Sequence, residues 1–204
     1  MNGFVSEWEH DILAAIDIPF VDTTTQYFDM GDDGFPAVGL RPGSDVKKPA
    51  RMHLPDKLSA EFSLLATIRP MTDAGGFLFA VVNPLETVVQ LGLEIAAAGP
   101  DAPGHTNISL LYTDVNSYAA TQCVAAFVVP SFTGKWARIA LAVKAEEVEL
   151  YFNCELAEKV SVVRRPAELV FDSASTLYVG QAGPIIKGVY DVSITLAPPS
   201  RPPN

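Results

Sequence analysis

Apolar and polar side chains alternate along residues 135–154 in a pattern that predicts two neighbouring β-strands. The larger apolar side chains of the first run fall at every second position from Ala137 to Val143, and those of the second run from Val148 to Phe152. Side chains of a strand point alternately to opposite faces, so each run offers one apolar face to a core. The charged residues between the runs suit a solvated turn, so the stretch is predicted to be a β-hairpin.

Similar strand patterns recur at short intervals along most of the chain. They cover residues 37–40, 50–53, 61–69, 77–82, 87–95, 107–113, 123–129, 136–144, 147–153, 159–163, 168–171, 176–180 and 187–196. Turn-forming Pro, Gly, Asn and Asp separate many of these runs, which favours an all-β sandwich over a fold that alternates strands with helices. Some runs are apolar on both faces, so we expect central strands or a sheet partly covered by loops.

One segment near the start, residues 7–17, has helical rather than strand periodicity. Ser6 stands where it can cap the helix, and Glu9 follows three residues later, as in a capping box. Pro19 is expected to end the helix. The predicted helix carries Trp8 on its apolar face and is expected to dock on the sandwich.

Composition narrows the class of protein. The chain has 204 residues, enough for one large all-β domain, which we place at 1–196; the proline-dense residues 197–204 are expected to begin a linker. A net charge of −10 disfavours nucleic acid and anionic membrane surfaces as partners. No apolar run reaches the roughly 20 residues of a membrane span. The first residues lack a signal-peptide pattern, so a secreted protein would have lost its signal peptide.

The residues of metal and redox chemistry are sparse and scattered. Cys123 and Cys154 fit two buried free thiols, a disulfide between them, or a disulfide from Cys154 to a cysteine outside this chain. The three histidines are far apart and form no zinc-binding pattern with the cysteines. An Asp- and Gly-rich stretch at 29–34 could offer calcium some oxygens, but turn formation explains the same residues. We therefore expect no metal and no cofactor.

Catalytic patterns are also missing from the sequence. Some sandwich hydrolases carry acids along one strand, and the nearest match here is Glu147-Val148-Glu149, without a third acid. Neither a nucleophile elbow nor a phosphate-binding loop is present. The protein is predicted not to be an enzyme, and a catalytic alternative would require paired acids in a groove.

Several segments, in their order and spacing, resemble the thrombospondin N-terminal-like domain, a laminin G-like module, in the form found in type XV and XVIII collagens. The segments that carry this resemblance are 34–51, 61–81, 107–114, 134–143, 148–155 and 178–188. The resemblance implies a concanavalin-like jelly-roll sandwich of two antiparallel sheets in a secreted protein of the extracellular matrix, at the basement membrane zone. It also implies a parent chain that trimerises through collagen segments, with the isolated domain a monomer, and matrix proteins or glycosaminoglycans as partners.

The resemblance also bears on the cysteines. In the family, the cysteine at the position of Cys154 commonly pairs with one shortly after the last strand, where this chain has only prolines and polar residues. Either that partner is missing or Cys154 pairs with Cys123 instead, which requires Cα atoms within roughly 7 Å.

Glycosaminoglycan binding, the ligand class that the family suggests, depends on clustered cations that meet sulfates. The candidate residues are Arg41, Lys47, Lys48, Arg51, Arg164 and Arg165. A lectin-like alternative would instead gather aromatic side chains on one sheet face, with Tyr112, Tyr118 and Tyr151 as candidates. Asn107 begins an Asn-Ile-Ser acceptor pattern and is a candidate glycosylation site on a secreted chain.

Overall fold

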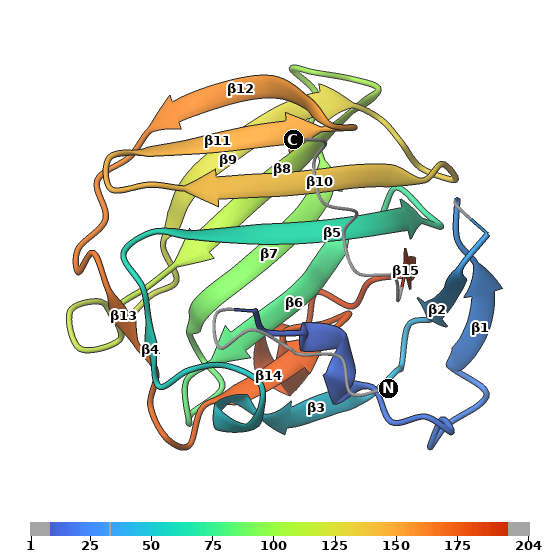
Figure 1. The fold of residues 1–204 in the computed structure, drawn as a ribbon, viewed down its shortest axis with the longest axis horizontal. Helices are drawn as coiled ribbons and strands as arrows, with labels where there is room; N and C mark the ends of the chain where they lie inside the picture. Colours follow the sequence, from blue (N-terminus) through green and yellow to red (C-terminus); the bar gives the residue numbers. More distant parts are fainter. Residues whose placement is uncertain (1–8, 33, 196–204) are drawn as a thin grey trace.

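Two antiparallel sheets packed face to face form the protein, seen in a computed structural model that describes residues 9–32 and 34–195 (Figure 1). The seven-stranded sheet has the order β1 (Gln26–Met30), β2 (Pro36–Leu40), β15 (Val192–Thr195), β5 (Phe62–Pro70), β10 (Ala137–Val143), β11 (Glu147–Phe152) and β12 (Glu155–Ser161). The six-stranded sheet has the order β3 (Val46–Pro49), β14 (Thr176–Val179), β6 (Gly76–Val82), β7 (Val89–Ala97), β8 (His105–Tyr112) and β9 (Cys123–Pro130). A short pair joins β4 (Lys57–Leu58) to β13 (Leu169–Val170). The all-β, two-sheet prediction is confirmed.

The core lies between the sheets and follows the alternation read from the sequence. Strands β10 and β11 pair as the predicted hairpin, with Leu141 opposite Leu150 and both side chains fully buried. Residues 137, 139, 141 and 143 are buried, whereas their neighbours on β10 are exposed or half-buried. Burial of one strand face at about 25 cal/mol per Å² of apolar surface is what fixes the register, because a one-residue slip would expose every core side chain.

The six-stranded sheet is also covered on part of its outer face. A second apolar cluster forms there around Phe77, Val82 and Tyr178, with Ala182 and Ile186 from the segment that contains helix α1 (Gly183–Ile186). This covering segment explains why every residue of β6 is buried. The expectation that loops cover part of a sheet is confirmed.

The predicted N-terminal helix is much shorter in the structure. It is the 3-10 helix η1 (Ile12–Ala15), capped by Asp11, whose carboxylate accepts from the Leu13 N–H at 2.9 Å. Glu9 and His10 are not helical, and Ser6 and Trp8 lie outside the described residues. Ala15 is buried in the core cluster, so docking on the sandwich is confirmed, although the helix is shorter than the predicted range of 7–17.

Several further elements differ from the sequence prediction, among them the short strands β3 and β4, which no predicted range covers. The expected strand at 50–53 is the 3-10 helix η2 (Ala50–Met52), because the chain turns after Pro49, which offers no N–H to continue a ladder. Strand β1 lies in a region for which the alternation predicted no strand. The strand expected at 187–196 is confined to β15 because the residues before it cover Phe77. The linker expected at 197–204 lies outside the described residues.

Candidate functional site

A groove beside strand β3 gathers three of the six predicted glycosaminoglycan-binding cations. Lys47, Lys48 and Arg51 line it on one side and residues 173–176 on the other, around a volume of about 410 Å³. Pairing of β3 with β14 holds the two sides together, with Lys48 opposite Leu177. The tertiary structure thus joins the basic segment to a serine-rich turn that the sequence analysis did not single out.

The lysines of this groove already have acidic partners. The Lys47 Nζ atom lies 2.8 Å from Asp45 Oδ2, and the Lys48 Nζ atom lies 2.8 Å from Asp17 Oδ2. The hydrogen bond that the Lys47 ammonium donates to the Asp45 carboxylate raises the pKa of Lys47, so the ammonium stays charged. Arg51 forms no ion pair within the described part of the chain. An anionic ligand would therefore meet Arg51 directly and would compete with two exposed aspartates for the lysines. Exposed ion pairs of this kind contribute little free energy, so the aspartates would be displaced at small cost.

Arg41 is not part of the groove. Its guanidinium lies 4.4 Å from the centre of the Tyr27 ring and donates to the Thr24 carbonyl at 3.0 Å. The Tyr27 ring in turn lies directly over Gly39, where any Cβ would overlap it. Arg41 therefore belongs to a separate surface on β1 and β2.

Arg164 is buried, so the structure removes it from the predicted set. Its side chain is 6% exposed and donates to the carbonyls of Ala60, Lys144 and Ala167. The guanidinium also lies 5.1 Å from the ring centre of Tyr112. A cation enclosed in this way links four segments of the fold and does not face a ligand in solvent. Arg165, the next residue, is exposed.

The disulfide between Cys123 and Cys154, one of the alternatives left open by the sequence, is not formed in the structure, in which both thiols are free and exposed. Cys123 is the first residue of β9, whereas Phe132 follows the last residue of that strand. Cys154 lies two residues after Phe152, the end of β11, and the ring centroids of Phe152 and Phe132 are 5.4 Å apart. Cys154 therefore lies near the end of β9 that is opposite to Cys123. A strand of this length spans roughly 23 Å, so the two thiols lie at opposite ends. Strand order, which the sequence does not show, separates the two cysteines.

The tyrosines of the lectin-like alternative do not meet on one face. Tyr112 is buried and donates to the carbonyls of Pro166 and Ala167, while Tyr151 lies on the other sheet and donates to Glu149 at 3.0 Å. Tyr118 is exposed in a loop outside the strands. The aromatic platform that this alternative requires is therefore not formed.

Asn107 lies within β8, half-buried, and its side-chain amide donates to the Ser109 hydroxyl at 3.0 Å. Glycosylation at this position stays a prediction.

Glu149, the acid weighed in the sequence as a catalytic candidate, is held in an ion-pair cluster. Its carboxylate is 4% exposed and accepts from Lys144 at 2.7 Å, and from Lys159 and Tyr151. The hydrogen bond from Lys144, followed by that from Lys159, lowers the pKa of Glu149 to about 2. A carboxylate that stays ionised and is surrounded by cations is a poor proton donor for glycoside hydrolysis.

Asp29, one of the calcium candidates, is likewise engaged, since it pairs with Arg69 and accepts from Ser193 at 2.5 Å. Within residues 9–32 and 34–195, no three His, Cys, Asp or Glu side chains gather into a metal-binding cluster. The same described ranges contain no helix with the length and hydrophobicity needed to cross a membrane.

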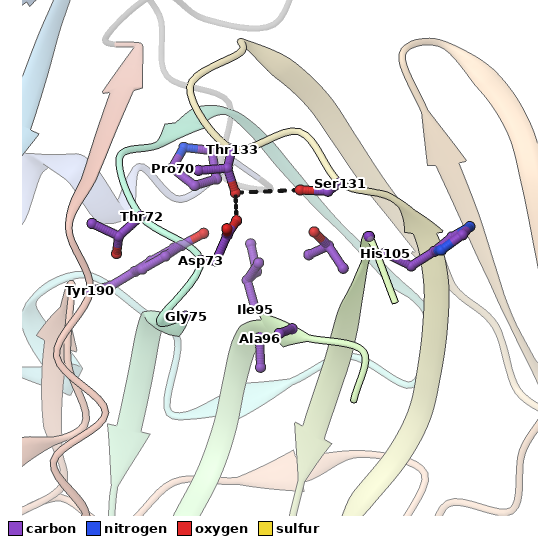
Figure 2. Close-up of a pocket in the computed structure, with 13 residues that line it drawn as sticks. Pro70, Thr72, Asp73, Gly75, Ile95, Ala96, His105, Ser131, Thr133 and Tyr190 are labelled. Atoms are coloured by element: carbon purple, nitrogen blue, oxygen red, sulfur yellow. Dashed lines mark hydrogen bonds between the residues drawn. The ribbon is translucent and has the colours of Figure 1, made fainter. Parts of the chain in front are cut away.

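A second cavity lies at the rim of the sandwich and was missed by the sequence analysis. It has a volume of about 150 Å³, and Figure 2 shows its lining, which includes Asp73, Ile95, Ser131, Thr133 and Tyr190. These residues come from separate loops and strands. No sequence motif joins them, so only the folded chain shows that they share a site.

The strand order defines the class of protein as an antiparallel two-sheet β-sandwich, and solved structures with a similar arrangement of strands are known. A pentraxin from Limulus polyphemus superposes with a TM-score of 0.51 at 12% identity, over 69% of this chain and 64% of the pentraxin. Domains LG4-5 of the mouse laminin alpha1 chain give a TM-score of 0.45 at 14% identity, over 74% of this chain and 38% of the laminin chain. At such identities the pentraxin match shows the fold alone.

Sequence comparison identifies the family. No family model matches the chain, but the human collagen alpha-1(XVIII) chain is 35% identical over 166 residues, which cover 79% of this chain. The chain spans only 9% of the length of that collagen. Together with the fold, this match confirms the resemblance noted in the sequence: the chain belongs to the thrombospondin N-terminal-like, laminin G-like domains of the type XV/XVIII collagens.

Proposed function

We propose that this domain is a non-catalytic recognition module of the extracellular matrix, the N-terminal non-collagenous head of a type XV/XVIII-like collagen. The observation that carries the proposal is the 35% identity to a collagen chain over 79% of the domain. A sandwich of this kind presents rim loops and sheet faces whose side chains can vary while the core is retained. Such surfaces suit adhesion and spacing at the basement membrane zone.

The state of the acidic side chains supports a role without catalysis. Hydrolysis of a glycosidic bond needs two carboxyl groups, about 5–10 Å apart, on opposite sides of the sugar. Glu149 is instead enclosed by two lysines, and Asp29 is paired with Arg69. The test is incubation of the domain with a panel of matrix oligosaccharides. Hydrolysis of any of them that is lost in the variant Glu149→Gln or Asp29→Asn would refute this proposal.

The groove of Lys47, Lys48 and Arg51 favours a second, more specific function, the binding of sulfated glycosaminoglycans. The three cations line one volume of about 410 Å³, large enough for several atoms of a sulfated sugar. Affinity for one site would be weak because two of the cations have acidic neighbours. A parent chain that forms a homotrimer through its collagen segments would carry three such sites and gain avidity.

Heparin chromatography tests this binding directly. We expect the domain to be retained at physiological salt and the triple variant K47Q/K48Q/R51Q to elute earlier. A control triple variant, K135Q/R138Q/K187Q, removes the same charge from exposed positions outside the groove and should be retained almost as well as the wild type. Elution of the wild type below physiological salt, or an equal loss in the control, would refute a site in the groove.

The matrix role is tested separately, by binding of the purified domain to a panel of basement-membrane proteins at physiological salt. Specific binding to at least one protein is expected. No binding to any protein or glycosaminoglycan of the panel would leave the domain a spacer and contradict a recognition function.

A further inference from the structure

The rim cavity contains a buried hydroxyl without a hydrogen-bond partner. The Tyr190 side chain is 1% exposed, and its hydroxyl has no partner among the described residues. Figure 2 shows this hydroxyl directed toward Asp73, into the space between the labelled side chains. A buried polar group that lacks a partner costs free energy, so its retention here suggests a ligand or water that satisfies it.

Backbone contacts hold the walls of this rim pocket in place. The Gly134 N–H donates to the Pro70 carbonyl at 2.7 Å, and the Ser131 N–H donates to the Gly104 carbonyl at 3.0 Å. Gly75 lies so close to β7 that a Cβ would come within 2.5 Å of the Ile95 carbonyl oxygen. The pocket is therefore built by close packing of the loops before β6, β8 and β10.

The side chains of the rim pocket are rich in hydroxyl groups and poor in charge. Thr72, Thr106, Ser131 and Thr133 line it with Tyr190, and Asp73 is its one carboxylate. Asp73 accepts from the Thr133 hydroxyl, which lies 3.4 Å from the Ser131 hydroxyl. No lysine or arginine lines the pocket, and Figure 2 shows the His105 ring pointing away from it.

This lining selects the chemistry of the ligand. An anion such as sulfate would meet a carboxylate and no cation, so it is disfavoured. Calcium seeks six to eight oxygens, usually with several carboxylates, and only Asp73 supplies one. A neutral polyol, in contrast, can donate to Asp73, exchange hydrogen bonds with the hydroxyl groups, and lay its C–H groups against Pro70 and Ile95.

The volume limits the size of the ligand. A cavity of about 150 Å³ matches the size that accommodates a single six-membered carbon ring in other proteins. It is about half the lower limit of sites for drug-sized molecules. The rim pocket can therefore hold one sugar ring, with the remainder of a glycan in solvent.

We propose that the rim pocket binds one neutral sugar residue of a glycan, with Asp73 accepting from the sugar hydroxyls and the Tyr190 hydroxyl completing the site. The inference goes beyond the matrix role proposed above and involves none of the cations of the basic groove. A single ring of about twelve heavy atoms should bind with a roughly millimolar dissociation constant, and greater affinity would require several copies on one glycan.

Saturation-transfer NMR with methyl glycosides of neutral hexoses, pentoses and N-acetylhexosamines tests the proposal on the wild-type domain. We expect at least one glycoside to show transfer, at the same strength with calcium or with a chelator. The variants Y190F and D73N should weaken that binding at least about fivefold. D172N, which removes an exposed aspartate outside the pocket, should bind as the wild type does.

Three outcomes would overturn the proposal. They are the absence of transfer to every glycoside of the panel, equal binding by Y190F, D73N and the wild type, and binding that requires calcium. Melting curves of each variant confirm that it is folded. If D73N does not fold, Y190F, which removes only the hydroxyl group, still tests the proposal. The K47Q/K48Q/R51Q variant should keep its sugar signals, so failure of the groove and failure of the rim pocket give different results.

Discussion

Arg164 offers the sharpest test of how this fold is held together, because its neighbour Arg165 is a matched control. Arg164→Met keeps most of the aliphatic volume and removes the guanidinium that donates to three carbonyls. Arg165→Met makes the same chemical change at an exposed position. The pair therefore separates the hydrogen bonds of one arginine from the loss of a charge in general.

The expected magnitude follows from the contacts. Three hydrogen bonds at a net ~1 kcal/mol each cost about 3 kcal/mol when their donor is lost. The stacking on Tyr112 at 5.1 Å adds about 0.5–1 kcal/mol. Arg164→Met should thus lower the free energy of unfolding by about 3–4 kcal/mol, or the melting temperature by roughly 6–16 °C for a domain of this size. Arg165→Met should cost less than about 0.5 kcal/mol.

Urea unfolding followed by tryptophan fluorescence measures both variants at equal protein concentration. Arg164→Lys should fall between the wild type and Arg164→Met, since one ammonium reaches fewer carbonyls than a planar guanidinium. A loss below about 1 kcal/mol for Arg164→Met would show that desolvation of the cation cancels its hydrogen bonds. An equal loss for Arg165→Met would refute the structural role altogether.

Two further predictions concern Glu149 and the turn before β12. Because the folded-state pKa of Glu149 is lowered to about 2, the stability from its ionised form is fully present above about pH 4.5 and is lost as the pH falls toward 2. Glu149→Gln should therefore be less stable at neutral pH and lose less on acidification, in melting curves between pH 6 and 2; an unchanged acid slope would contradict the role of Lys144 and Lys159. Asn153 and Cys154 both have positive φ, at 52° and 70°, as in a hairpin turn that favours Asn-Gly. Cys154→Gly should raise the free energy of unfolding by about 0.5–1 kcal/mol, whereas Cys123→Ala should change it little; a destabilised Cys154→Gly would refute the strain.

Much of the fold could be read from the sequence. Alternation at Ala137–Val143 and Val148–Phe152 fixed the hairpin of β10 and β11, because a strand with one apolar face can be buried in only one register. The same periodicity located most strands of both sheets. Periodicity failed for the predicted helix at 7–17. Asp11 caps the helix only at Ile12, and the few apolar residues that follow form a single short 3-10 helix, η1.

The make-up of the candidate binding surfaces was decided by tertiary structure. Arg164 and Arg165 are indistinguishable in the sequence, yet packing of four segments buries one and leaves the other in solvent. The rim pocket likewise unites Asp73 with Tyr190 across more than a hundred residues of chain. Periodicity reports which face of a strand is apolar, because burial acts on each strand separately. Which loops meet at a rim depends on strand order and long-range pairing, and no local pattern encodes it.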